Sequence, residues 1–355
     1  MPSERVVIAM SGGVDSSVAA SRLVDAGYDV VGITLHLWDY PDEASEKTRC
    51  CAPEDQHDAR RVADFLGIPH YSFDRRELFK ARVVDPFVTS YLNGETPSPC
   101  VACNRTVKMR ELFALADRLD ARHVATGHYA RVHVEAGRAR LFRGVDGHKD
   151  QAYFLHMLGQ NDLSRLLLPL GSSTKSDVRQ EALDRGLPGA NKGESQELCF
   201  VSSANYSSFV AERAEGRIRP GPVVDDTGRT LAEHEGIHRF TIGQRKGLGV
   251  AIGRPAFVVG IDPVAGTVRL GNEAALYSSE AHIEDATWND DVEFPLEAQV
   301  RVRARHEGAD ATVERSGARF VARFHAPVRA VSPGQAAVAY RGDRVLGGGT
   351  IASAR

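Results

Sequence analysis

The chain has 355 residues, of which 42% are hydrophobic and 26% are charged, and its formal net charge is -3. These proportions are typical of a globular protein, and the length suits roughly two or three domains of about 150 residues. The charge balance excludes a protein that coats nucleic acid over its whole surface, but it allows a local basic surface for RNA. No apolar run approaches the roughly 20 residues of a membrane helix, and the first residues do not form a signal peptide. We therefore expect a cytoplasmic protein with no membrane partner.

A short apolar run at residues 6–9 leads into Ser-Gly-Gly-Val-Asp-Ser-Ser at residues 11–17, and a helix-like segment follows at once. Glycines let the backbone approach a ligand, and the free N–H groups of a helix N-terminus bind anions. The sequence is not a Walker A loop, because the Gly-Lys-Ser/Thr ending is missing. Asp15 would repel a bare phosphate, so its presence predicts a magnesium ion between the two. The pattern resembles the PP-loop of ATP pyrophosphatases, which implies cleavage of ATP between the α and β phosphates.

Residues 6 to about 205 alternate between strand-like and helical segments. Strands are predicted at residues 30–35, 70–73 and 123–126, and helices at residues 58–66 and 111–119. Such alternation predicts a parallel sheet with helices on both faces. Ligands of these sheets bind at the carboxyl ends of the strands, which is where the Ser-Gly-Gly segment falls.

The pattern changes after Tyr206, where short β-like segments separated by glycine take over. Asp-Asp-Thr-Gly at residues 225–228 predicts a hairpin turn. We expect three domains: an α/β ATP-binding domain at 1–205, a small mostly-β domain at 206–275, and an antiparallel β-barrel at 276–355.

The five cysteines are too few for a disulfide scaffold, so reactive thiols or metal ligands are expected. Cys100 and Cys103 form a Cys-x-x-Cys pair next to two prolines, and the prolines predict a loop instead of a helix interior. Cys-x-x-Cys suits a redox pair, half a zinc site or part of an iron–sulfur site, and buried inert thiols are the alternative. Cys199 by itself would more often be a packing residue, and Cys50 and Cys51 are treated as incidental.

Four further segments could contact a ligand. Residues 126–129 (Thr-Gly-His-Tyr) follow a strand, although His128 alone would usually be structural. Residues 149–151 read as a charged turn, and residues 243–249 place two cations among three glycines. Arg301, Arg303 and Arg305 are spaced by two, so in a strand they would share one face. Three neighbouring positive charges often bind a polyanion, although a solvent-exposed surface is the ordinary explanation for such a pattern.

Together these segments resemble one family, the bacterial tRNA-specific 2-thiouridylases. The motifs run in the family's order over nearly the whole chain, at residues 9–16, 96–104, 125–129, 149–151, 199–200, 241–249 and 332–335. The resemblance implies a transferase that adenylates the C2 oxygen of the wobble uridine with ATP and magnesium and then replaces that oxygen with sulfur. The base must leave the anticodon stack to be reached, at a cost that protein contacts must offset.

The resemblance also assigns residues. The positions that match ATP contacts are Ala9, Met10, Ser11, Gly12, Gly13, Val14, Asp15, Ser16, Leu35 and Gly127. The positions that match contacts with the tRNA anticodon stem-loop are Ser98, Pro99, Cys100, His128, Lys149, Asp150, Gln151, Arg305, His306 and Gln335.

In the scheme usual for the family, Cys199 carries a persulfide received from a sulfur-relay protein or a cysteine desulfurase. Cys103 is the partner nucleophile, and the pair ends as a disulfide that a reductant reopens. A cation-lined phosphate site would favour the thiolates. Some members have an aspartate where this chain has Cys100. With Cys100 added, the three cysteines could instead hold an iron–sulfur cluster that binds hydrosulfide.

Two other functions compete with this interpretation. Another PP-loop ligase or amidotransferase would adenylate a carbonyl without needing Cys199. A non-catalytic RNA-binding protein would use the arginines of the barrel but would leave Asp15 without a role.

Overall fold

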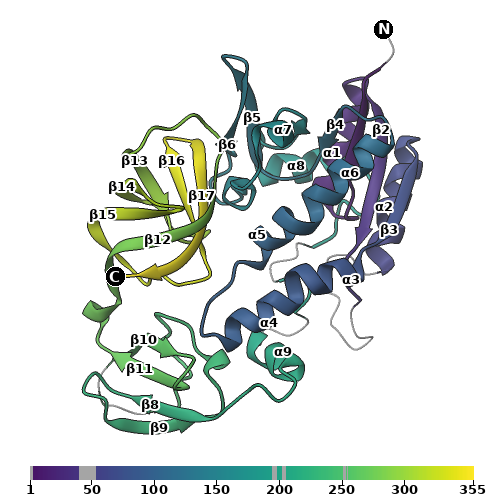
Figure 1. The fold of residues 1–355 in the computed structure, drawn as a ribbon. Coiled ribbons are helices and arrows are strands. Elements are labelled where there is room, and N and C mark those ends of the chain that lie inside the picture. The colour runs from purple at the N-terminus through teal and green to yellow at the C-terminus, as the bar shows by residue number, and fades with distance from the viewer. Residues whose placement is uncertain (1–2, 40–52, 194–197, 202–204, 251–252, 254) are drawn as a thin grey trace. The chain divides into compact units, whose positions relative to one another are not determined.

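The computed structural model describes residues 3–39, 53–193, 198–201, 205–250, 253 and 255–355. The chain forms two compact units, which are described separately. Unit 1 comprises residues 1–83, 100–204 and 343–345, and unit 2 comprises residues 84–99, 205–342 and 346–355. Figure 1 labels the elements. Within the described residues, no helix is both long enough and apolar enough to cross a membrane. Cys50 and Cys51 lie outside the described residues.

Unit 1 is built on a five-stranded parallel sheet in the order β3-β2-β1-β4-β7. Its strands are β1 (Arg5–Ala9), β2 (Asp29–His36), β3 (His70–Asp74), β4 (His123–Ala125) and β7 (Leu166–Leu167). Its main helices are α1 (Val14–Asp25), α2 (Pro53–Leu66), α3 (Arg76–Phe79), α6 (Met109–Arg118), α7 (Gln160–Leu163) and α8 (Lys175–Asp184). The α/β architecture predicted from the alternation is confirmed, with each predicted strand and helix within a few residues of its expected place.

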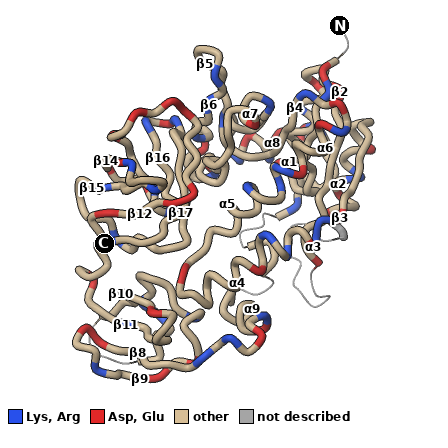
Figure 2. The backbone as a smooth tube through the Cα atoms, viewed as in Figure 1, with Lys and Arg blue, Asp and Glu red and all other residues tan. Residues whose placement is uncertain are grey.

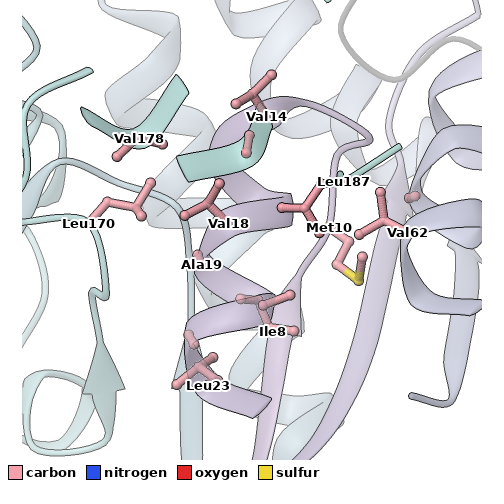
Figure 3. Packing of buried hydrophobic residues seen from close by; sticks show 14 of the residues in the cluster. Ile8, Met10, Val14, Val18, Ala19, Leu23, Val62, Leu170, Val178 and Leu187 are labelled. Atoms are coloured by element: carbon pink, nitrogen blue, oxygen red, sulfur yellow. The ribbon is translucent and has the colours of Figure 1, made fainter. Parts of the chain in front are cut away.

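The middle of the central strand β1 is apolar because both of its faces are covered. Val6 and Ile8 of β1 pack with Val18 of α1, Val62 of α2 and Val178 of α8 in one cluster of buried side chains (Figure 3). The opposite face of β1 contacts α6, whose Leu112 is fully buried. This two-sided burial fixes β1, and with it the loop at its carboxyl end.

An antiparallel hairpin departs from the predicted strand–helix alternation. It consists of β5 (Ala130–Glu135) and β6 (Arg138–Arg143), which are joined by a two-residue turn at Ala136 and Gly137. Both turn residues have positive φ, of 50° and 77°, as hairpin turns of this length require. The alternating polar and apolar residues of this segment were not recognised from the sequence.

Unit 2 holds two β structures. A four-stranded sheet in the order β10-β11-β8-β9 contains β8 (Gly221–Val224), β9 (Thr230–His234), β10 (Phe257–Asp262) and β11 (Thr267–Gly271). The turn predicted at residues 225–228 joins β8 to β9 and is confirmed. Helices α4 (Asp85–Leu92) and α9 (Tyr206–Arg213) belong to the same unit and contact each other.

The second β structure is an antiparallel barrel, as predicted. Its strands are β12 (Tyr277–Trp288), β13 (Leu296–Arg301), β14 (Ala309–Ser316), β15 (Arg319–Arg329), β16 (Ala336–Arg341) and β17 (Arg344–Ala354). The pairing of β12 with both β15 and β17 closes the barrel. The first residues of β17 belong to unit 1, where Arg344 pairs with Phe142 of β6.

Candidate active site

The Ser-Gly-Gly loop, residues 11–17, lies between the carboxyl end of β1 and the start of α1. Gly12 has a φ of 71°, and a Cβ atom there would lie 2.3 Å from the carbonyl oxygen of Asp55, so only glycine fits. The hydroxyl groups of Ser16 and Ser17 both donate to the carbonyl oxygen of Gly13, at 2.9 and 3.0 Å. Because the N-cap is a glycine, no cap side chain competes for the N–H groups of the first turn. The loop therefore has the form of an anion site, as the sequence predicted.

Asp15, in the first turn of α1, contacts two side chains from distant parts of unit 1. The Nζ atom of Lys175 lies 2.7 and 2.8 Å from its two carboxylate oxygens, and the hydroxyl group of Tyr129 donates to Oδ1 at 2.7 Å. The sequence indicated neither partner. An ammonium group at the mouth of an anion loop is itself a phosphate ligand, so the structure adds Lys175 to the candidate ATP contacts.

Lys175 reaches Asp15 because the start of α8 is fixed at several points. Thr174 and Asp177 form a capping box at its N-terminus. Further along α8, Glu181 forms an ion pair with Arg22 of α1. The guanidinium group of Arg22 holds the pKa of Glu181 below its usual range. A capping box is visible in the sequence, but nothing local shows that its helix meets residue 15.

Two predicted ATP contacts, Gly127 and Leu35, differ in how they relate to the same loop. A Cβ atom on Gly127 would lie 3.0 Å from the backbone of Asp15 and Ser16, so Gly127 allows the segment after β4 to touch the loop. Leu35 is buried in β2, and the hydroxyl group of its neighbour Thr34 donates to the carbonyl oxygen of Met10 at 2.8 Å. Gly127 therefore lies against the Ser-Gly-Gly loop, whereas Leu35 is placed only as the residue after Thr34 near the carboxyl end of β2.

The next residue, His128, is a neutral histidine. Its Nδ1 atom lies 2.8 Å from the hydroxyl group of Thr126. Burial, together with the nearby charge of Lys108, lowers the pKa of His128 to about 3. At neutral pH the ring therefore acts as a hydrogen-bonding group and not as a cation.

The low pKa of His128 predicts a pH-dependent stability. Between pH 7 and 5 the His128 ring becomes protonated in the unfolded chain but stays neutral in the folded protein. The free energy of unfolding should therefore fall by about 2 kcal/mol over this range. Replacing His128 with Gln should remove this part of the decrease, whatever the variant does to stability at pH 7. Urea unfolding of both proteins at several pH values measures the two slopes. Equal slopes would show that His128 titrates normally in the folded protein.

Cys100 and Cys103 lie in a helix, not in the predicted loop. Helix α5 (Pro99–Cys103) begins at Pro99, and the π-helical segment η3 (Asn104–Lys108) follows and leads directly into α6. Proline is favoured at the first position of a helix because its missing N–H needs no partner there. The prediction read the prolines as helix breakers when they mark a helix start. The π-helical turn after Cys103 is of a rare kind that is frequent at functional sites.

The Cys103 thiol is 6% exposed, whereas Cys100 is exposed. Burial raises the pKa of Cys103, and the charge and backbone hydrogen bond of Lys108 only partly offset it. The expectation that cations would favour the thiolate is therefore wrong for Cys103 in this structure. Lys108 influences both Cys103 and His128, so the structure brings these two residues to one neighbourhood of unit 1.

Cys199 is half-buried and belongs to unit 1. Its neighbour Phe200 is buried against Trp38 and Phe79, with ring centroids 6.3 and 5.7 Å apart. Trp38 lies two residues after the end of β2. This aromatic cluster therefore holds Cys199 near the carboxyl end of the sheet, at the same edge as the Ser-Gly-Gly loop.

Residues 149–151 form a bonded turn beside His128, not the solvated turn that is usual for such a sequence. Gln151 binds the backbone of Tyr129 twice: its side-chain oxygen accepts the Tyr129 N–H at 3.0 Å, and its own N–H donates to the Tyr129 carbonyl at 2.8 Å. The carboxylate of Asp150 accepts the N–H groups of Gly144 and Ala152. Lys149 is half-buried.

The remaining predicted tRNA contacts belong to unit 2, apart from Cys100. The side-chain amide of Gln335 donates to the carbonyl oxygens of Thr96 and Pro97, at 2.8 and 3.2 Å. The Thr96 N–H donates to the carbonyl oxygen of Pro333. The structure thus joins the segment that contains Ser98 and Pro99 to the motif at residues 332–335.

Arg301, Arg303 and Arg305 do not share a strand face, because β13 ends at Arg301 and a turn follows. The guanidinium group of Arg301 is held by the carbonyl oxygens of Ala304 and His306, so its role here is to shape the turn. Arg303 and Arg305 are exposed, and burial together with the charges of Arg303 and Arg301 lowers the pKa of His306. The loop at residues 243–249 also presents exposed cations, Arg245 and Lys246.

The site's fit to the predicted metals differs between magnesium and iron. The carboxylate of Asp15 and the hydroxyl groups beside it are the oxygen ligands that magnesium prefers. Within the described part of the chain, which includes Cys100, Cys103 and Cys199, no three His, Cys, Asp or Glu side chains are grouped to hold a metal ion. These cysteines do not form a ligand set for a cluster in this structure.

Comparison with known proteins matches all parts of the chain. A family model described as "tRNA methyl transferase HUP domain" matches residues 4–203, a "PRC-barrel domain" of the same group matches 207–272, and an "Aminomethyltransferase beta-barrel domain" matches 278–351. These descriptions mention methyl transfer, but the curated relatives are named for thiolation.

Three of those relatives are called tRNA-specific 2-thiouridylase MnmA. The protein of Sorangium cellulosum (strain So ce56) is 69% identical, over 99% of this chain and 92% of its own length. The proteins of Chloroflexus aurantiacus (strain ATCC 29366 / DSM 635 / J-10-fl) and Moorella thermoacetica (strain ATCC 39073 / JCM 9320) are each 47% identical, over 98% of this chain and 98% and 99% of theirs. The chain therefore belongs to the family of tRNA-specific 2-thiouridylases.

Proposed function

We propose that this tRNA-uridine 2-sulfurtransferase uses ATP to adenylate the C2 oxygen of the wobble uridine and then replaces that oxygen with sulfur carried by Cys199. The observation that carries the proposal is the close approach of Gly127 to the Ser-Gly-Gly loop in unit 1. His128 follows Gly127 in sequence, and the charge of Lys108 acts, second to burial, to lower the pKa of both His128 and Cys103. These observations support a site that combines the phosphate-binding loop with the Cys103 thiol.

In the first half of the reaction, the backbone N–H groups of the loop and the Lys175 ammonium group bind the phosphates. Asp15 would hold magnesium, which would neutralise phosphate charge when bound. Lys175 and Asp15 neutralise each other before ATP arrives, so the loop need not hold an uncompensated carboxylate. Adenylation turns a poor oxide leaving group into AMP.

In the second half, the terminal sulfur of a Cys199 persulfide attacks C2 of the uridine and AMP leaves. The Cys103 thiolate then attacks the Cys199 sulfur, the sulfur–sulfur bond breaks, and its electron pair stays on the sulfur bound to C2. The products are 2-thiouridine and a Cys103–Cys199 disulfide, which an external thiol reductant reopens. Because Cys103 is buried, its thiolate must form through a local movement of α5 and η3 or at a raised pH.

The proposal includes the partners and the compartment. The tRNA anticodon stem-loop would contact the residues assigned to it by the resemblance, and a sulfur-relay protein or cysteine desulfurase would load Cys199. We place the enzyme in the cytoplasm, with domains at 1–205, 206–275 and 276–355.

Mass spectrometry of wobble nucleosides tests the function directly. tRNA incubated with enzyme, magnesium, ATP and a persulfide donor should yield 2-thiouridine together with AMP and pyrophosphate. AMP formation on tRNA without sulfur incorporation would favour another PP-loop ligase or amidotransferase. Tight tRNA binding without any ATP turnover would favour a non-catalytic RNA-binding protein. An active preparation free of iron, as shown by metal analysis and its visible spectrum, would reject the cluster route.

A further inference from the structure

Asp146 begins the turn at residues 146–151, and its carboxylate forms hydrogen bonds on two sides. Oδ1 accepts the backbone N–H groups of His148 and Lys149, at 3.0 and 3.3 Å. These two bonds are local and are usual for an aspartate in a turn. Oδ2 accepts the backbone N–H of Lys175 at 3.0 Å, 29 residues further along the chain. The needs of a local turn explain the bonds of Oδ1 but not the bond of Oδ2.

The N–H that Asp146 accepts belongs to the first residue of α8, and the side chain of that residue, Lys175, binds Asp15. This bond is the largest reason why the pKa of Asp146 lies below its usual range. Helix α8 contacts α1, and Figure 2 shows charged residues of both signs along these two helices. The Asp15–Lys175 pair is thus one of several charge pairs here, and Asp146 helps to select it by holding the backbone of Lys175.

The other end of the turn holds the second partner of Asp15. Gln151 binds both the N–H and the carbonyl group of Tyr129, at 3.0 and 2.8 Å. The hydroxyl group of Tyr129 in turn donates to Asp15 at 2.7 Å. Asp146 and Gln151 therefore connect the two ends of one short turn to the two partners of one carboxylate.

We propose that Asp146 is a positioning residue that makes ATP binding at the Ser-Gly-Gly loop depend on tRNA binding at residues 149–151. The outer side of the turn is open to RNA, since Gly147 and His148 are exposed. A tRNA that holds the turn also holds the backbone of Lys175, so less ordering is left for ATP to impose and ATP binds more tightly. By the same linkage, ATP tightens tRNA binding by an equal factor.

The inference rests on the proposed tRNA contacts of residues 149–151, but it does not depend on the persulfide route. Asp146 is outside the motifs from which the sequence predicted ATP and tRNA contacts. Its role would be to link two binding sites, because its bonds go to backbone groups of the turn and of α8.

Binding of an ATP analogue, with a methylene group between its α and β phosphorus atoms, measures the coupling in the presence of magnesium. The quantity is the dissociation constant without tRNA divided by that with saturating tRNA. For the parent protein we expect a ratio of about five or more. The reverse experiment, tRNA binding with and without the analogue, should give the same ratio.

Asp146→Asn and Asp146→Ser are the test variants. Asn has one acceptor oxygen and one donor group, so it cannot accept both the His148 and the Lys175 N–H groups. Ser keeps an oxygen for the local turn but is too short to reach Lys175 as well. Either variant should lower the ratio to about two or less. Both should fold, because the turn stays attached through the Val145 N–H, which donates to the carbonyl oxygen of Gly171 at 3.0 Å.

Asp177→Asn is the matched control, because Asp177 also fixes the start of α8. Its carboxylate accepts the hydroxyl group of Thr174 at 2.7 Å, and among the described residues none of its hydrogen bonds reaches the turn. A variant that only loosens α8 weakens analogue binding equally with and without tRNA, so the loss cancels in the ratio. Asp177→Asn should therefore keep the ratio of the parent, whatever it does to either affinity.

The outcomes separate the coupling from the proposed function. A parent protein that fails to bind tRNA at all would refute the proposed function and the coupling with it. A parent protein that binds tRNA with a ratio of one would overturn the coupling alone. Asp146→Asn and Asp146→Ser proteins that melt like the parent and keep its ratio would also overturn it, as would a ratio that falls just as far in Asp177→Asn.

Discussion

Replacing Asp15 with Asn should reduce the tRNA-dependent conversion of ATP to AMP and pyrophosphate by about a thousandfold. The carboxylate is the group at the Ser-Gly-Gly loop best suited to hold magnesium, and it also anchors Tyr129 and Lys175. Asn keeps the shape of the side chain but loses the negative charge that both magnesium binding and the pairing with Lys175 need. Release of pyrophosphate, measured with saturating tRNA, reports the effect.

Lys175 should behave differently from Asp15 in the same assay. Lys175→Met removes a phosphate ligand but leaves the Asp15 carboxylate, so the KM for ATP should rise by roughly tenfold or more, while Lys175→Arg should recover part of the loss. Asp25→Asn is the control, because Asp25 ends helix α1, which begins near Asp15, and is paired with Arg185. Unchanged ATP kinetics in Lys175→Met would show that the lysine only neutralises Asp15.

The sequence predicted the parallel sheet and the barrel well because their signals are local. Short apolar runs, such as residues 6–9 and 30–35, and glycine-marked turns are patterns that a short window contains. The Ser-Gly-Gly loop is of the same kind, since the positive φ of Gly12 belongs to the loop itself and favours glycine. The partners of Asp15 carry no such signal. Lys175 is 160 residues away, and only the packing of α8 on α1 brings it there.

The cysteine motif was predicted wrongly for a different reason. The rule that proline breaks a helix was applied to a proline that stands at the first position of one. A proline ends a helix from its interior but begins one at its first residue, and Pro99 is the first residue of α5. That difference matters for chemistry, because the helix buries Cys103 and raises its pKa. No spacing rule distinguishes an exposed thiol in a loop from a buried one in a helix.

In a single turnover without added small thiol, Cys103→Ser and Cys199→Ser should each abolish the formation of free 2-thiouridine, with losses of about a thousandfold or more, but for different reasons. Without Cys199 no sulfur is carried, so tRNA should be adenylated and nothing further should form. Without Cys103 the persulfide can still attack C2, but the mixed disulfide between Cys199 and the uridine sulfur cannot be opened by the protein. Cys103→Ser should therefore trap a covalent adduct of protein and tRNA.

Non-reducing gels and nucleoside mass spectrometry separate these outcomes. The Cys103→Ser adduct should disappear on addition of a small thiol, with release of 2-thiouridine, whereas Cys199→Ser should form no adduct with a persulfide donor. Cys100→Ser serves as the control for a neighbouring, exposed thiol and should keep most of the activity if the two-cysteine route operates. If Cys100→Ser instead fails as completely as the other two and the parent enzyme contains stoichiometric iron, three thiols act together and the cluster route replaces the persulfide. Full release of 2-thiouridine by Cys103→Ser without any small thiol would exclude both routes, because each requires the Cys103 thiol. Cys103 would then act only as a buried packing residue.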